Sequence, residues 1–131
     1  MVGKHLGKHI MLDLEFEPQH KMLTDATIFM MVIEKTIKDH GATVLNVDHH
    51  QFGDGGGYTF TYILAESHAS CHTWPEHGIA TLDIYMCGDC DAFSAMDQFK
   101  YDIEHNHSGK LNKFTETKVF RGWVDNGTPT E

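Results

Sequence analysis

The chain is poor in basic residues. Only ten of its 131 residues are lysine or arginine, against nineteen aspartate or glutamate, which gives a formal net charge of −9. Binding to a phosphate backbone requires clustered lysine and arginine, and these ten are scattered, so the composition argues against a nucleic-acid-binding protein. The negative charge instead favours a cationic ligand, because long-range attraction steers such a ligand toward the protein.

Long apolar runs are also missing. No run approaches the roughly 20 residues that a helix needs to cross a bilayer, and residues 1–5 lack the apolar segment of a secretory signal peptide. We therefore expect a cytoplasmic protein with no membrane partner. Three cysteines, an odd number without an export signal, do not make a disulfide framework. The length and the 40% hydrophobic content suit a single domain over residues 1–131.

Apolar periodicity predicts a mixed fold. Alternating residues predict strands over 9–16, 42–48, 58–65, 79–87 and, weakly, 118–123. Helical spacing predicts a helix over roughly 25–40, capped by Thr24 or Asp25, and a second one capped by Asp91, while residues 126–131 look like a solvated tail. One mainly antiparallel sheet with both helices packed on one face is an α+β two-layer sandwich.

The strand expected over 79–87 has two different faces. Ala80, Leu82, Ile84 and Met86 face one side, and Thr81, Asp83, Tyr85 and Cys87 face the other. The helices would cover the apolar side, but the single chain has no elements left for the polar side. Because a site that excludes water needs a cover, and symmetric dimers are the commonest way to supply one, we expect a homodimer that buries this face.

Reactive side chains concentrate between residues 65 and 88. Glu66 precedes Ser67, His72 follows five positions later, Trp74-Pro75-Glu76 forms a turn, and Cys87 ends the next strand. These are too many reactive types for an ordinary strand pair. The segment therefore indicates chemistry rather than packing.

This arrangement resembles the bacterial and archaeal type of S-adenosylmethionine decarboxylase. The likeness is carried by Glu66-Ser67-His68, residues 72–76 and Cys87-Gly88, with residues 6–9, 41–43 and 50–52 in agreement, and it extends over roughly residues 6–121. The resemblance implies a proenzyme that cleaves itself between Glu66 and Ser67 into a β chain, 1–66, and an α chain, 67–131. It also implies a pyruvoyl cofactor made from Ser67, a homodimer of processed αβ units, S-adenosylmethionine as substrate and a role in polyamine (spermidine) synthesis.

Self-cleavage begins with attack of the Ser67 hydroxyl on the Glu66 carbonyl, which forms an ester if the backbone is strained and the oxyanion stabilised. Removal of the serine α-proton then expels Glu66 as a carboxylate, and the remaining dehydroalanine hydrolyses to pyruvoyl. A histidine suits the α-proton step because it titrates near neutral pH, and the resemblance implies His72. Residues five apart on a flat strand point to opposite faces, so we expect a bend or bulge between Ser67 and His72.

The resemblance implies the remaining roles. The pyruvoyl group would form a Schiff base with the substrate amine and accept the electrons released with carbon dioxide, after which Cys87 would supply a proton. Phe52 would stack on adenine, Glu76 would hold the ribose hydroxyls, and Thr59 replaces a serine that assists processing. The glycine-rich loop at residues 53–57 is either a connector or a close approach to a ligand.

Three other interpretations stay open. A pyruvoyl-dependent arginine or ornithine decarboxylase would use the same Ser67, His72 and Cys87. The decarboxylation groups act only on the α-amino acid end of the substrate, which all these substrates share. A metal-binding or redox module would use Cys87 and Cys90, but zinc sites usually need four soft ligands and Cys71 stands apart, so we expect no metal. An inactive partner subunit would keep the fold without processing.

Overall fold

The computed structural model of the protein describes residues 4–124. Its elements are, in chain order, β1 (Gly7–Glu15), the 3-10 turn η1 (Lys21–Leu23), α1 (Thr27–Asp39), β2 (Val44–Gln51), β3 (Tyr58–Leu64), β4 (Ser67–Trp74), the 3-10 turn η2 (Pro75–His77), β5 (Ile79–Cys87), α2 (Ala92–Asn106) and β6 (Lys113–Arg121). Within these residues the strands form one six-stranded sheet in the order β2-β3-β4-β5-β1-β6, and each neighbouring pair is antiparallel.

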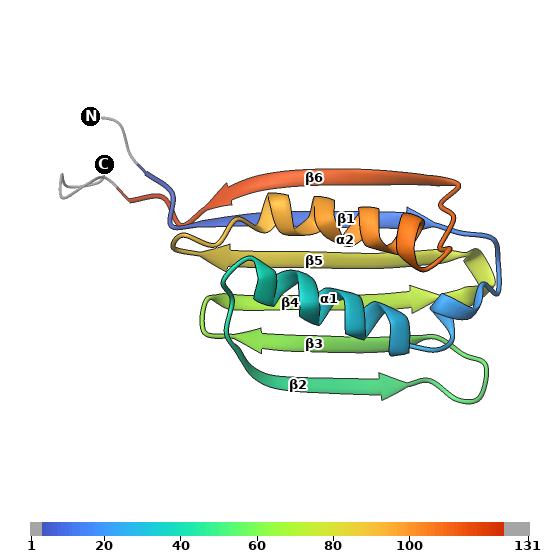
Figure 1. Ribbon diagram of the computed structural model, residues 1–131. Coiled ribbons are helices and arrows are strands. Elements are labelled where there is room, and N and C mark those ends of the chain that lie inside the picture. Colours follow the sequence, from blue (N-terminus) through green and yellow to red (C-terminus); the bar gives the residue numbers. More distant parts are fainter. Residues whose placement is uncertain (1–3, 125–131) are drawn as a thin grey trace.

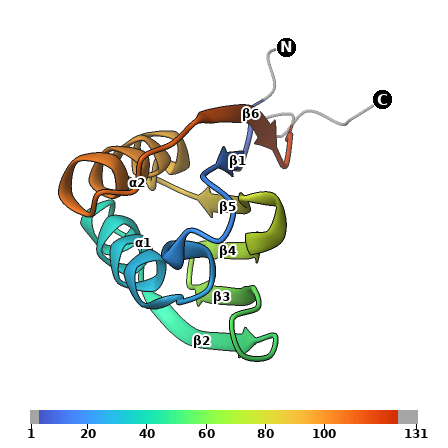
Figure 2. The ribbon, with the colours of Figure 1, turned by 90° about the vertical axis from the view of Figure 1, so that its right-hand side faces the viewer.

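The two helices cover one face of the sheet. Figure 1 shows α1 and α2 side by side over the sheet, both running roughly along the strands, and Figure 2 shows both on the same side of the sheet. We name the opposite side the outer face, and the described residues place no helix on it. This architecture confirms the expected α+β two-layer sandwich. Neither helix in the described range combines the length and the apolar character that a membrane span requires.

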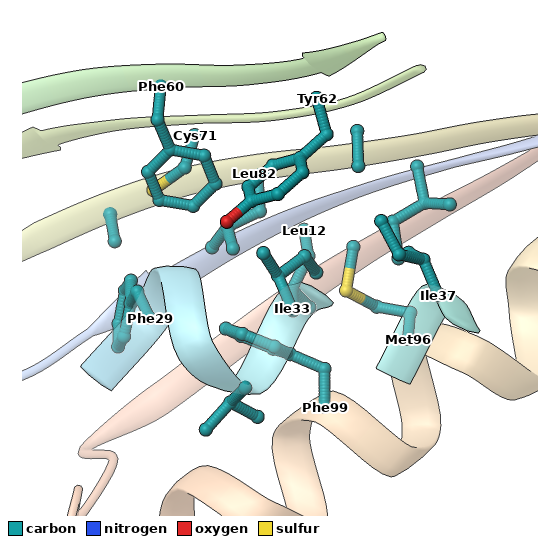
Figure 3. Close-up of a cluster of buried hydrophobic side chains, with 14 of the residues drawn as sticks. Leu12, Phe29, Ile33, Ile37, Phe60, Tyr62, Cys71, Leu82, Met96 and Phe99 are labelled. Carbon is teal, nitrogen blue, oxygen red and sulfur yellow. The ribbon is translucent and has the colours of Figure 1, made fainter. Parts of the chain in front are cut away.

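Alternation in the strands and helical spacing in α1 and α2 build the core between the two layers. Figure 3 shows side chains of the sheet facing those of the helices. Buried side chains in this view are Leu12, Phe60, Tyr62, Cys71 and Leu82 from the sheet and Phe29, Ile33, Ile37, Met96 and Phe99 from the helices. Each fully buried Leu, Ile, Phe or Met contributes roughly 1.5–3 kcal/mol by leaving water. The intervening strand residues are thereby directed to the outer face.

Two strands differ from the expectation. The sequence pattern does not predict a strand at Ser67–Trp74, yet β4 lies there in the interior of the sheet. Its buried side chains, Ala69, Cys71 and Thr73, are small, so the segment lacks the bulky alternation that identifies a strand. The last strand begins at Lys113 rather than near residue 118, because its whole length pairs with β1.

The structure confirms the predicted start of one helix and differs at the other. Asp91 is the N-cap of α2, where its carboxylate accepts hydrogen bonds from two backbone N–H groups of the first turn. Helix α1 begins at Thr27, and its N-cap, Ala26, makes no side-chain hydrogen bond. Asp25 still accepts a hydrogen bond of 2.9 Å from the Thr27 N–H. The tail expected over residues 126–131 lies outside the described residues.

Candidate active site

The residues expected to act on the cleavage bond lie toward opposite ends of β4. Ser67 is the first residue of the strand and His72 the sixth. Pairing with β3 and β5 continues without interruption between them, so the expected bend or bulge is wrong: neighbours on both sides keep the strand extended. At about 3.3 Å per residue, five steps place Ser67 and His72 about 16 Å apart. In Figure 1, β4 starts at the left of the sheet and ends at the right.

Glu66, Ser67 and Cys87 meet at the start of β4, and we name this group the cleavage end. Ser67 has a φ of 146°, a region that residues with a side chain rarely adopt, and such outliers cost on the order of 1–3 kcal/mol. The carbonyl oxygen of Glu66 accepts a hydrogen bond of 3.0 Å from the backbone N–H of Cys87. The Glu66 carboxylate accepts one of 2.9 Å from the N–H of Thr43. The backbone at the Glu66–Ser67 bond is therefore strained, and its carbonyl oxygen already faces a donor.

Thr59, His72 and Phe52 meet near the far end of β4, and we name this group the His72 end. Thr59 Oγ1 and His72 Nδ1 form a hydrogen bond across paired positions of β3 and β4. The ring centroids of Phe52 and His72 are 5.6 Å apart, and those of His72 and Trp74 are 4.2 Å apart. Glu76 is exposed in η2, the turn that directly follows Trp74. The structure thus brings most of the predicted residues into two groups rather than one.

A cluster that the sequence pattern does not predict lies on the outer face beside the cleavage end. Its members are His9 on β1, His68 on β4 and Asp83 on β5, and we name it the His–Asp cluster. Asp83 Oδ2 accepts hydrogen bonds from His9 Nε2 at 2.7 Å and from His68 Nε2 at 2.9 Å. The other carboxylate oxygen accepts one from the Ser70 hydroxyl.

The charge of Asp83 follows from these bonds. Burial alone would raise the pKa of this carboxyl, but the hydrogen bonds from Ser70, His9 and His68 outweigh it and lower the pKa below its ordinary value. Asp83 is therefore an anion that accepts from both histidines. Strand alternation could have placed each residue on the polar face, but only the strand order β4-β5-β1 makes them neighbours.

Two of the three cysteines have thiols that are hard to ionise. Cys71 is buried in the core, and burial raises the pKa of its thiol well above the ordinary value. Partial burial and nearby negative charges also raise the pKa of the Cys90 thiol. A reactive or metal-binding cysteine needs a thiolate that forms easily. In residues 4–124, the group whose potential ligand atoms all lie within 4.8 Å of one another is the His–Asp cluster, which contains no cysteine.

The glycine-rich loop is shaped by close backbone packing. A Cβ atom on Gly56 would lie 1.9 Å from the carbonyl oxygen of Phe52, and one on Gly57 would lie 2.3 Å from the carbonyl oxygen of Thr73. Both positions therefore need glycine for contacts inside the chain. These contacts support the connector interpretation of the loop, which holds Phe52 beside His72.

The fold and the site together define a two-layer α+β domain with a strained serine at a strand end. The chain belongs to the S-adenosylmethionine decarboxylase family, whose model matches residues 8–112.

Individual relatives agree with this assignment. The S-adenosylmethionine decarboxylase proenzyme of Pyrobaculum aerophilum is 39% identical over 84 residues, which are 64% of this chain and about two thirds (66%) of that protein. The proenzyme of Aquifex aeolicus is 41% identical over 97 residues, covering 73% of this chain and 70% of its own. The crystal structure of the adenosylmethionine decarboxylase from Aquifex aeolicus is 32% identical with a TM-score of 0.77, and the match covers 97% of this chain and 99% of that one.

Proposed function

We propose that this protein is the proenzyme of a pyruvoyl-dependent S-adenosylmethionine decarboxylase. Its single domain over residues 1–131 cleaves itself between Glu66 and Ser67 into a β chain, 1–66, and an α chain, 67–131. The processed enzyme acts in the cytoplasm, and its product is the aminopropyl donor for spermidine synthesis. The observation that carries the proposal is the strained Ser67 backbone together with the Cys87 N–H on the Glu66 carbonyl, in a member of this family.

Strain and hydrogen bonding both favour the first step of processing. The Ser67 hydroxyl attacks the Glu66 carbonyl carbon, and negative charge develops on the carbonyl oxygen. The Cys87 N–H, already 3.0 Å from that oxygen, stabilises the charge; one such donor is worth about 100- to 1000-fold in rate at other oxyanion sites. Breaking the C–N bond also frees Ser67 from its unfavourable φ.

The later steps use groups from both ends of β4. His72 removes the α-proton of Ser67, and Glu66 leaves as a carboxylate. Water then converts the remaining dehydroalanine to the pyruvoyl group, and the Ser67 nitrogen leaves as ammonia. When formed, the pyruvoyl group supplies the electron sink that decarboxylation requires. Cys87, exposed beside the cleavage bond, donates a proton to the substrate carbon that has lost carbon dioxide. Phe52 and Glu76, beyond the other end of β4, hold the adenosine part of the substrate.

One chain alone does not assemble this site, because about 16 Å of β4 separates Ser67 from His72. We place a second copy of the chain against the outer face, which carries no helix within residues 4–124. A twofold axis then sets the cleavage end of each copy against the His72 end of its partner. The homodimer of processed αβ units would hold two sites, each built from both copies.

Carbon dioxide release from carboxyl-labelled S-adenosylmethionine, arginine and ornithine tests the substrate. We expect release from S-adenosylmethionine alone. Phe52 is 49% exposed beside His72 and offers its ring to an adenine, which the basic amino acids lack. Comparable release from arginine or ornithine would favour the amino-acid decarboxylase instead. Release of carbon dioxide from none of the three would favour an inactive partner subunit.

Replacing Cys87 by serine should separate processing from turnover. The Cys87 N–H remains in this variant, so the chain should still split. Decarboxylation per processed chain should fall by about 100-fold or more, because a hydroxyl is a much weaker acid than a thiol. A misplaced proton would also inactivate the cofactor by transamination. Mass spectrometry gives the processed fraction and labelled carbon dioxide gives the rate; full activity of processed Cys87→Ser would remove Cys87 from the mechanism.

A further inference from the structure

We propose that His68 is the base that accepts the Ser67 hydroxyl proton in the acyl shift, and that Asp83 and His9 hold His68 in the form that can do so. The inference rests on the proposed function, because it assigns a residue to the first step of self-processing.

His68 lies within reach of the reacting hydroxyl. Its Nδ1 is 3.3 Å from Ser67 Oγ. A general base must lie at hydrogen-bond distance from the proton it takes, and such contacts are often slightly long before the reaction. His72, by contrast, lies five residues further along an uninterrupted strand of the same chain. Ser67, whose hydroxyl makes this contact with His68, is also the residue with the unusual φ.

The hydrogen-bond network assigns the tautomer of His68. Asp83 is an anion and only accepts, so the His68 Nε2 that contacts it at 2.9 Å carries the ring proton. Nδ1 of the neutral ring is then an acceptor, and it is this atom that faces Ser67. The order carboxylate, imidazole, hydroxyl is the arrangement by which a histidine activates a serine.

His9 supports the same protonation pattern. Arg121 lies with a guanidinium nitrogen 3.1 Å from His9 Nδ1, and an arginine can only donate. His9 Nδ1 is therefore the acceptor, and His9 Nε2 donates to Asp83 at 2.7 Å. The side chains of His9 and Asp83 are only 12% and 21% exposed, which limits competition from water for these bonds.

The same bonds oppose a metal ion at the His–Asp cluster. A metal bound between the three side chains would need the unprotonated Nε2 of both histidines. In the network, Nε2 of His9 carries a proton because Arg121 occupies Nδ1. The guanidinium charge beside the ring would also repel a cation.

The step balances within the chain. The proton of Ser67 Oγ moves to His68 Nδ1, Oγ bonds to the Glu66 carbonyl carbon, and the carbonyl oxygen becomes an oxyanion on the Cys87 N–H. The C–N bond then breaks, the proton returns from His68 to the leaving Ser67 nitrogen, and the carbonyl reforms as an ester. Asp83 stabilises the transient imidazolium without taking a proton. His68 would thus form the ester, and His72 would remove the α-proton afterwards.

The division of roles between His68 and His72 can be tested on freshly synthesised proenzyme. Mass spectrometry follows cleavage between Glu66 and Ser67 over time, with and without hydroxylamine, which cuts esters. We expect His68→Ala to split about 100-fold or more slowly and to hold no hydroxylamine-sensitive ester. Added imidazole should restore part of the rate by filling the space of the lost ring. His72→Ala should instead accumulate the ester, and hydroxylamine should cut it between Glu66 and Ser67.

His68→Gln is the second variant, since it can keep the hydrogen bond to Asp83 but cannot take up a proton. His105→Ala, an exposed histidine on α2, is the matched control and should process normally. Processing of folded His68→Ala or His68→Gln within about threefold of the wild-type rate would overturn the assignment. Loss of processing with a chelator and its return with zinc would overturn it in favour of a metal. A wild-type chain that never splits at this bond would refute the proposed function itself.

Discussion

Replacing Ser67 by alanine is expected to leave one intact chain of 131 residues without a carbonyl cofactor. No hydroxyl then remains to attack the Glu66 carbonyl, and no serine remains from which a pyruvoyl group could form. Mass spectrometry should show the full-length mass alone, where the wild-type protein shows the two fragments 1–66 and 67–131. Decarboxylation should fall to the level of a blank without enzyme.

Ser94→Ala is the matched control for this experiment, because Ser94 is exposed in the first turn of α2 and lies outside the proposed site. It should split and turn over as the wild-type protein does. Cleavage of Ser67→Ala between residues 66 and 67 would show that the Ser67 hydroxyl is not the nucleophile.

Mixing two inactive variants, Ser67→Ala and His72→Ala, is expected to restore cleavage. Within one chain the two residues are about 16 Å apart, so each site of the proposed homodimer would take Ser67 from one copy and His72 from the other. In a mixed dimer, one site combines the intact Ser67 of the His72→Ala chain with the intact His72 of the Ser67→Ala chain. That site should process, while the second site lacks both groups.

Different affinity tags on the two variants let mass spectrometry assign the fragments to a chain. All fragments should derive from the His72→Ala chain, and each variant alone should give none without hydroxylamine. Sedimentation at micromolar concentration and neutral pH shows whether mixed dimers form. Mixed dimers that stay uncut, or an active wild-type monomer, would contradict a site shared between copies.

The sequence predicted which residues form the candidate site, but it did not predict that they lie at opposite ends of β4. The family resemblance predicts Ser67, His72 and Cys87 as site residues, and their roles stay predictions. The spacing also suggested that Ser67 and His72 meet through a bend in the strand. This prediction was wrong because the spacing describes β4 in isolation from its neighbouring strands. Pairing of β4 with β3 and β5 on both sides keeps the strand straight, and a local pattern contains no information about such partners.

By itself, the sequence determined the secondary-structure classes, the two faces of most strands and the residue types available for chemistry. These properties are local, because helical and strand periodicities decide which side chains share a face. Only the tertiary structure decided that β4 lies in the interior of the sheet and that His9, His68 and Asp83 meet beside Ser67. Residues 9 and 83 become neighbours through pairing of distant strands, and the free energy of that pairing comes from burial of the whole sheet against the helices rather than from any short segment.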